Sequence, residues 1–257
     1  MKHLLFSLIL ILFSPSLIAS SIIAKKIFPS TISVVAEDNN GQALSLGSGF
    51  MIEDDIAVTN FHVIEGASSG YIKFINQEGI YEILGVTAYN PKFDLALIKV
   101  DKLNNPTLEL SVSNIDIGDK VYAVGNPLGL EGTFSDGMLS GVRDFEDVTV
   151  FQITAPISPG SSGGPVTDDE GNVIGVAVAK IEKEGIEGFN FGIKSSVLKS
   201  FTNSNNLKLI TASRSRISQN QLTSLVTDGT VYIDCWLTIS DIEKIMKQSS
   251  EKAFYSE

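Results

Sequence analysis

Short β-branched runs dominate the sequence between residues 31 and 191, and they constrain the fold more than any other feature. The runs at 31–37, 56–59, 81–89 and 148–153, each of which we expect to form one strand, are rich in Val, Ile and Thr, and Gly, Asn, Asp and Pro separate them. This spacing is typical of all-β barrels, and helical periodicity is scarce in the region. We therefore predict an all-β fold of two small barrels, with the turn-forming residues 104–106 as the seam between them.

The pattern changes after Gly192. Residues 195–203 have the composition of a short helix, and a Ser-, Asn- and Arg-rich linker follows. The remaining chain holds a strand-like run at 230–237 and a helix signal at 240–248. About fifty residues are marginal for an independent domain, so we expect residues 206–257 to be a short C-terminal tail.

The first twenty residues resemble a targeting segment. Lys2 and His3 precede an apolar run, and small residues surround Ala19 and Ser20. Ten apolar residues rise only about 15 Å as a helix, which is half the thickness of a bilayer core. We predict a signal peptide at residues 1–20, an extracytoplasmic (periplasmic or secreted) location, and no stable membrane span once the signal is cleaved. An uncleaved anchor remains the alternative, because the apolar character continues to Ile23.

Composition excludes several classes of function. The chain has 19 basic and 30 acidic residues, and this net charge of −11 argues against a nucleic-acid partner. One cysteine, Cys235, permits neither an intrachain disulfide nor a cysteine-based metal site. The only histidines are His3 and His62, so removal of the signal leaves one imidazole and excludes a metal site built from several histidines. We expect no cofactor and no metal.

A serine lies among glycines and prolines at residues 157–165, which read Ile-Ser-Pro-Gly-Ser-Ser-Gly-Gly-Pro. Glycines let a substrate carbonyl approach the main chain, where the amides of Gly160 and Ser162 could converge on a developing oxyanion. A serine nucleophile needs an adjacent base, and His62 is the only candidate. At this level a plain glycine-rich turn remains the alternative.

His62 follows an apolar strand and a polar turn, an arrangement that would place the imidazole at a strand end facing a cleft. The base also needs an acceptor that fixes its tautomer, and Asp94 precedes an apolar run at 95–98. A carboxylate at the mouth of such a strand is costly to bury unless it is hydrogen-bonded. Asp94 is therefore the strongest candidate for the orienting acid.

In chain order these His, Asp and Ser segments resemble those of the trypsin-like serine proteases, most closely the bacterial HtrA/DegP-like branch. The matching motifs are Thr-Asn-Phe-His-Val at 59–63, Asp-Leu-Ala-Leu at 94–97, Gly-Asn-Pro at 125–127 and Pro-Gly-Ser-Ser-Gly-Gly-Pro at 159–165. The likeness covers roughly residues 45 to 200.

The resemblance implies a chymotrypsin/trypsin-like double β-barrel over residues 21–205, with the active site in the cleft between the barrels. It implies that Ser162 is the acylated nucleophile, His62 the general base and Asp94 its orienting partner. The amides of Gly160, Ser161 and Ser162 would form the oxyanion hole.

Two departures from the family are visible. Ser161 stands where the family has Asn, and the tail is too short for the PDZ domain of HtrA-like proteins, which puts regulated, chaperone-like behaviour in doubt.

Trypsins that cut after Lys or Arg carry an acid where this chain has Pro156. We therefore expect a small apolar substrate pocket and cleavage after Val, Ala, Ile or Leu. The residues expected to wall that pocket are Pro156, Val178, Ala179, Phe189, Asn190 and Phe191.

These observations lead to one hypothesis and one alternative. The hypothesis is an exported serine endopeptidase that hydrolyses polypeptide substrates through an acyl-enzyme. The alternative is a catalytically silent trypsin-fold binding module that engages a protein partner. The sequence does not indicate an oligomeric state.

Overall fold

The computed structural model describes residues 15–111, 113–126, 132–145, 148–178 and 190–212. The chain divides into two units, Met1–Arg214 and Ser215–Glu257, and every described residue belongs to the first. The expected strand at 230–237 and helix at 240–248 lie outside the described residues.

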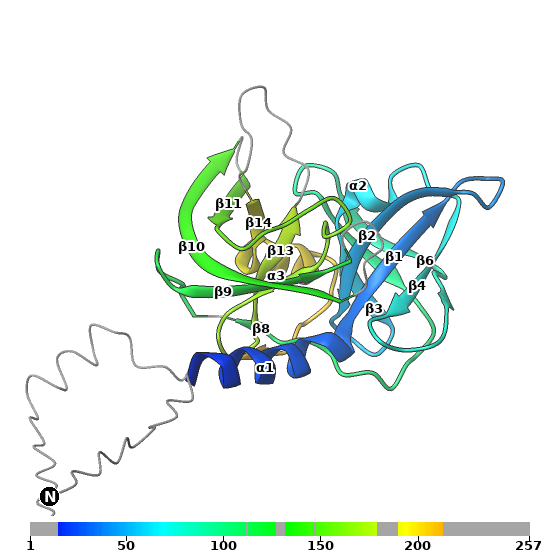
Figure 1. Ribbon diagram of the computed structural model, residues 1–257. Coiled ribbons are helices and arrows are strands. Elements are labelled where there is room, and N and C mark those ends of the chain that lie inside the picture. The colour runs from blue at the N-terminus through cyan, green and yellow to red at the C-terminus, as the bar shows by residue number, and fades with distance from the viewer. Residues whose placement is uncertain (1–14, 112, 127–131, 146–147, 179–189, 213–257) are drawn as a thin grey trace, which may run out of the picture. The chain divides into compact units, whose positions relative to one another are not determined.

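The first half of the fold is one antiparallel sheet with the strand order β5-β4-β1-β2-β3-β7-β6. Its strands are β1 (Thr31–Glu37), β2 (Ala43–Met51), β3 (Ile56–Thr59), β4 (Ser69–Phe74), β5 (Tyr81–Glu82), β6 (Gly85–Asn90) and β7 (Leu95–Lys99). Alternate residues of β1 face the interior, and Ile32, Val34 and Ala36 are buried there. Figure 1 shows these strands, coloured blue to cyan, as one wrapped layer.

This sheet curls back on itself because its two edge strands are consecutive in the chain. The Ile83 amide donates to the Gly70 carbonyl, whereas the next amide, that of Leu84, donates to the Lys99 carbonyl. The chain thus changes its pairing partner between two successive residues. For this reason the single strand expected at 81–89 is two strands, β5 and β6.

The second half is an eight-stranded sheet with the order β12-β9-β10-β11-β14-β13-β8-β15, and β12 also pairs with β13. Its strands are β8 (Leu110–Ser111), β9 (Lys120–Gly125), β10 (Thr133–Phe145), β11 (Val148–Ile153), β12 (Pro165–Thr167), β13 (Val173–Val178), β14 (Asn190–Lys194) and β15 (Thr211–Ala212). Because β12 pairs on both sides, six of these strands close into a barrel. The all-β architecture of two barrels predicted from the sequence is confirmed.

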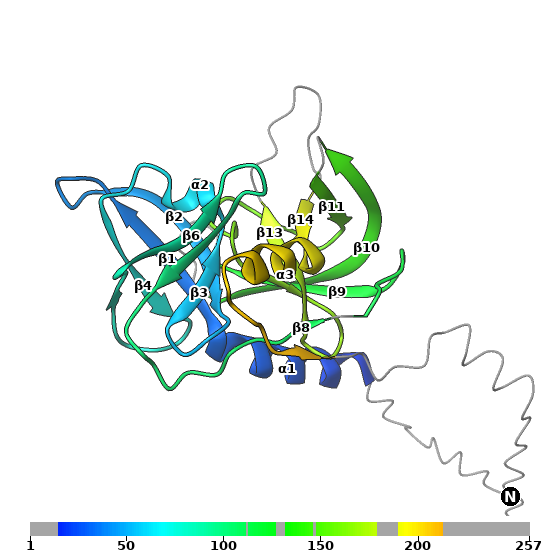
Figure 2. The ribbon, with the colours of Figure 1, turned by 180° about the vertical axis from the view of Figure 1, so that it is seen from behind.

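The chain passes from the first sheet to the second between β7 and β8, and this stretch contains residues 104–106. The second sheet continues to β15, past the boundary expected at residue 205, because Thr211 and Ala212 pair with β8. The segment expected to be helical at 195–203 forms α3 (Ser195–Ser204), which packs on β13. Figure 2 shows α3 in front of the second barrel.

Helix α1 (Pro15–Ile27) runs through the expected cleavage site and leads into a 3-10 turn, η1 (Phe28–Ser30). Both views place α1 beside β8 (Figures 1 and 2). Ile23 and Ile27 are buried in a cluster that also contains Leu110 and Val173. The Lys26 ammonium donates to the Glu170 carbonyl at 2.7 Å. Beyond residue 20, therefore, α1 packs as part of the folded unit.

Three clusters of buried apolar side chains form the core. One lies inside the first barrel and contains Ile72 and Phe74, and another lies inside the second and contains Phe151. The third spans both barrels, because it joins Phe50 and Val58 with Tyr122, Val124, Val176 and Ile193. Each of these side chains contributes about 1.5–3 kcal/mol when buried, so the third cluster fixes the barrels against each other.

Candidate active site

His62 lies in a four-residue helix, α2 (Phe61–Ile64), directly after β3. Strand β3 is buried throughout and pairs with β2 and β7, so its carboxyl end is rigidly placed. Asn60 turns the chain out of the strand, and Val63, which is 1% exposed, anchors the helix to the core. The imidazole therefore emerges at the end of a fixed strand, with its side chain about one quarter exposed.

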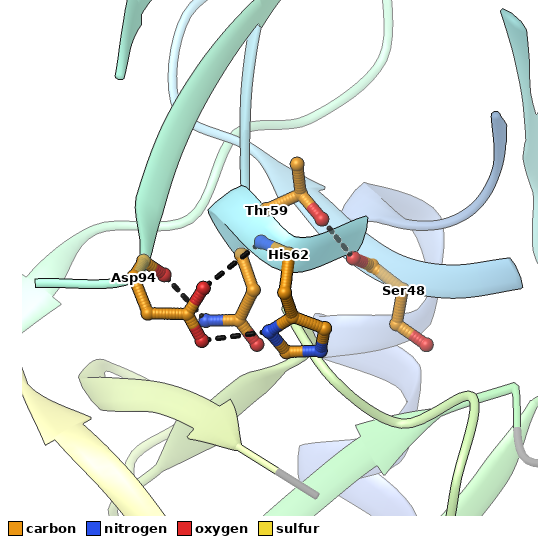
Figure 3. Close-up of polar contacts among 5 residues, drawn as sticks. Ser48, Thr59, His62 and Asp94 are labelled. Carbon is orange, nitrogen blue, oxygen red and sulfur yellow. Dashed lines mark hydrogen bonds and ion pairs between the residues drawn. The ribbon is translucent and has the colours of Figure 1, made fainter. Parts of the chain in front are cut away.

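Asp94 contacts His62 at two points. One carboxylate oxygen, Oδ1, accepts the His62 main-chain N–H at 2.9 Å, and the other, Oδ2, lies 2.7 Å from Nδ1 (Figure 3). A carboxylate can only accept, so Nδ1 carries the proton and Nε2 is the ring's remaining acceptor. This arrangement fixes both the tautomer and the orientation of the ring.

The backbone of Asp94 has an unusual conformation. Its φ of 52° lies in the left-handed region, which costs a non-glycine residue about 1–3 kcal/mol. The side-chain amide of Asn60, which is fully buried, donates to the Asp94 main-chain carbonyl at 2.8 Å. Asn60 thus holds the strained residue from the strand end that also carries His62.

Residues 158–164, here called the serine loop, contain Ser162 and precede β12. The loop begins with a tight turn in which the Ser161 amide donates to the Ser158 carbonyl at 2.9 Å. Gly160 occupies this turn with a φ of 96°, a conformation that favours glycine. The Ser161 amide is therefore engaged within the loop, and of the three amides expected in the oxyanion hole, those of Gly160 and Ser162 remain the candidates.

The serine loop packs directly on the strands that lead to His62. Gly163 has a φ of 87°, and a Cβ there would collide with the Ser48 carbonyl and lie 2.5 Å from the Thr59 hydroxyl. The Ser48 amide donates to the Ser162 carbonyl at 2.7 Å, and Thr59 Oγ1 donates to the Ser48 carbonyl at 2.8 Å (Figure 3). The structure thus brings the Ser162 loop against the residues that precede His62.

A small pocket lies behind the serine loop. Its lining comprises Ala123, Val124, Gly125, Thr133, Ser135, Pro156, Ile157, Ser161 and Ala177. Of the residues expected to wall the substrate pocket, Pro156 lines this one. Asn190 lies next to it, because its Oδ1 accepts the Ile157 amide at 3.2 Å. Val178 and Phe191 are buried on β13 and β14 and are not part of this lining, and Ala179 and Phe189 lie outside the described residues.

Two residues of the site had no role assigned from the sequence. Ser48 contacts the serine loop and lies outside the matching motifs, whereas Asn60 holds Asp94 and lies within the motif at 59–63, which was matched for its histidine. The available signals are a serine between two glycines before an apolar run, and an asparagine at a strand end two residues before His62.

Within the described ranges, no group of three or more His, Cys, Asp or Glu side chains is placed to hold a metal ion. No helix in that part of the chain is both long and apolar enough to cross a membrane.

The family model described as a trypsin-like peptidase domain matches residues 47–176. A probable periplasmic serine endoprotease DegP-like of Chlamydia muridarum is 39% identical over 163 residues, covering 60% of this chain and 32% of the relative. A protein of the same name from Halomonas elongata is 36% identical over 170 residues, covering 63% and 35%. The serine protease HtrA-like of Staphylococcus aureus is 33% identical over 154 residues, covering 53% and 20%.

The match thus spans about a third of the length of the DegP-like relatives. Among solved structures, a serine endoprotease from Yersinia pestis superimposes with a TM-score of 0.64 at 26% identity, covering 72% of this chain and 66% of that one. These findings confirm the resemblance and the double-barrel fold predicted from the motifs.

Proposed function

Because the chain belongs to the trypsin-like peptidase family, we propose that it is a serine endopeptidase that hydrolyses polypeptides through Ser162, His62 and Asp94. The observation that carries the proposal is the two-point contact between Asp94 and His62 beside the Ser162 loop. A carboxylate that fixes the imidazole in this tautomer is what a serine nucleophile needs from its base.

The proposed chemistry proceeds in two acyl-transfer steps. His62 Nε2 takes the Ser162 hydroxyl proton as the oxygen attacks the scissile carbonyl, and the amides of Gly160 and Ser162 stabilise the oxyanion. The imidazolium then gives its proton to the leaving amine, which leaves an ester on Ser162. Water, activated by the same imidazole, hydrolyses the ester and restores the serine. Asp94 stabilises the imidazolium in both steps.

We propose that the enzyme acts outside the cytoplasm, after removal of residues 1–20 as a signal peptide. The relatives from Chlamydia and Halomonas carry the word periplasmic in their names, which supports this location. The protease domain would then begin at residue 21, and Ile23 and Ile27 of α1 would stay in the mature chain. The absence of an acid at Pro156 supports a preference for apolar residues before the scissile bond.

The test is labelling of the purified mature protein with a fluorophosphonate, read by intact mass, beside the Ser162→Ala variant. One adduct on the wild type and none on Ser162→Ala are expected. Internal fragments from a reduced and alkylated protein substrate, identified by mass spectrometry, would distinguish an endopeptidase from an exopeptidase. A folded wild-type protein that takes no label would contradict the proposal and favour the silent binding module.

A further inference from the structure

Ser48 lies in β2 of the first barrel and is fully buried. Both of its main-chain polar groups are hydrogen-bonded: the amide donates to the Ser162 carbonyl, and the carbonyl accepts from the Thr59 hydroxyl. Ser33 on β1 is its cross-strand partner. Ser48 is therefore the point where the first barrel meets the serine loop of the second.

The Ser48 hydroxyl donates one hydrogen bond and accepts two, the weaker of which comes from the Asn126 side-chain amide at 3.4 Å. Oγ lies 2.7 Å from the Gly160 carbonyl and 2.9 Å from the Asn126 main-chain amide. A carbonyl can only accept and an amide N–H can only donate, so the single hydroxyl proton points at Gly160. Both Gly160 and Asn126 belong to the second barrel, and the hydroxyl joins two of its loops.

These contacts fix the peptide groups around the Ser162 amide. Ser48 holds the Gly160 carbonyl with its hydroxyl and the Ser162 carbonyl with its amide. The peptide between these two contains the Ser162 N–H, and its own carbonyl, that of Ser161, accepts from the Gly164 amide at 3.0 Å. In a planar trans peptide the N–H points opposite to the C=O, so the direction of the Ser162 N–H is set.

Gly160 is the residue of this loop whose backbone can rotate most easily. It lacks a Cβ and already sits at a positive φ, so rotation of its peptide costs little unless a partner holds the carbonyl. The Ser161 amide holds one end of that peptide through Ser158, and the Ser48 hydroxyl holds the other. Without the hydroxyl, the partly buried Gly160 carbonyl would lose its partner, and rotation of the peptide would let it find another.

We propose that Ser48 is a positioning residue for the oxyanion hole, acting from the first barrel on the two peptide groups that flank the Ser162 amide. The inference rests on the proposed serine endopeptidase function. Ser48 would not touch the substrate. It would hold the direction of the Ser162 amide before the substrate binds, so that no reorganisation of this donor is needed as the oxyanion forms.

The test compares wild type, Ser48→Ala and Ser33→Ala in the full mature chain. Ser33 is the matched control, because it is a buried serine of the same barrel whose hydroxyl donates to a main-chain carbonyl, that of Lys73 at 3.3 Å. The fluorophosphonate provides the limiting rate of phosphonylation and the half-saturating concentration separately. The pH dependence of the limiting rate and the thermal unfolding midpoint complete the measurements.

For Ser48→Ala we expect the limiting rate to fall about tenfold to a hundredfold, below the loss for removal of a whole oxyanion donor. The half-saturating concentration and the pH midpoint should stay within about twofold of wild type, because the contact between His62 and Asp94 is untouched. Ser33→Ala should match wild type in all of them. A merely structural role for Ser48 would lower the unfolding midpoint without this selective loss of rate.

The outcomes separate the two proposals. A wild-type protein that takes no label overturns the proposed function itself. A wild type that labels beside a Ser48→Ala variant with the same limiting rate, or with only a weaker half-saturation, overturns the role of Ser48 alone. If Ser48→Ala does not fold, Ser48→Cys decides, since a thiol fills the site but donates weakly; an unchanged limiting rate in Ser48→Cys overturns the inference.

Discussion

Replacing Asn60 with alanine should impair the site more than it impairs the fold. The buried Asn60 amide donates to the main-chain carbonyl of Asp94 at 2.8 Å, and Asp94 has a left-handed φ of 52°. Without that bond, Asp94 can relax toward a common backbone conformation, and its carboxylate then leaves the position in which it meets His62. The expected result is a fall in activity, because the imidazole loses its fixed tautomer and orientation.

The magnitude follows from two terms. Leaving the partly buried Asp94 carbonyl unpaired costs on the order of 1 kcal/mol, and relief of the left-handed backbone returns about 1–3 kcal/mol, so both favour the displaced conformation. A net bias of about 2 kcal/mol corresponds to roughly a thirtyfold fall in the population of the competent site. The free energy of unfolding should change by only about 1 kcal/mol, because Asn60 Oδ1 is itself buried without a partner among the described residues, and truncation removes that penalty.

The assay measures the limiting rate of fluorophosphonate labelling and the urea midpoint of unfolding. Asn172→Ala is the matched control, since Asn172 is equally buried but its Oδ1 accepts from Lys26, far along the chain from the site. Asn60→Asp preserves the shape and replaces the donor with an ionised acceptor, so it should lose at least as much activity as Asn60→Ala. A labelling rate for Asn60→Ala within twofold of wild type would refute the reasoning.

Two further predictions concern single backbone features. Gly163→Ala should lower the free energy of unfolding by on the order of 4 kcal/mol, among the largest effects of a single substitution. The added Cβ would collide with the Ser48 carbonyl, and the φ of 87° at this position is strained for alanine. A thermal melt by circular dichroism that matched wild type would contradict this packing. Amide hydrogen bonds from Gln42 and Asn40 hold the pKa of Asp38 below its usual value. The carboxylate therefore contributes stability above its unfolded pKa and loses it as the pH falls through the folded pKa, so the urea midpoints of wild type and Asp38→Ala should converge in acid; a constant difference between pH 7 and pH 2.5 would contradict this.

The local sequence pattern predicts the bounds of a strand where turn-forming residues flank a β-branched run. Residues 31–37, 56–59 and 148–153 form strands with the expected bounds, because β-branched residues there are flanked by strong turn formers. The run at 81–89 is equally continuous in sequence, yet its pairing changes between Ile83 and Leu84. That division comes from a change of pairing partner between distant strands, which no local pattern records.

Local sequence patterns also predict only part of the site. The motifs around the histidine, the aspartate and the serine identified the segments, and the structure places these segments against one another. The residues that hold them, Ser48 and Asn60, act through main-chain groups 112 and 34 positions away. Asn60 lies within the motif at 59–63, but no local pattern identifies the distant carbonyl that either side chain contacts, so only the three-dimensional arrangement shows what each one does.

The packing between the barrels and the geometry of the site depend on each other. Phe50 lies two residues beyond Ser48 on β2, so both side chains are on the same face of the strand. Phe50 belongs to the cluster that joins the barrels, together with Tyr122 and Val176 of the second. Hydrogen bonds weaken within a few tenths of an ångström, whereas apolar contacts tolerate such shifts. A small movement of one barrel would therefore break the contacts of Ser48 with the serine loop while both barrels remained folded.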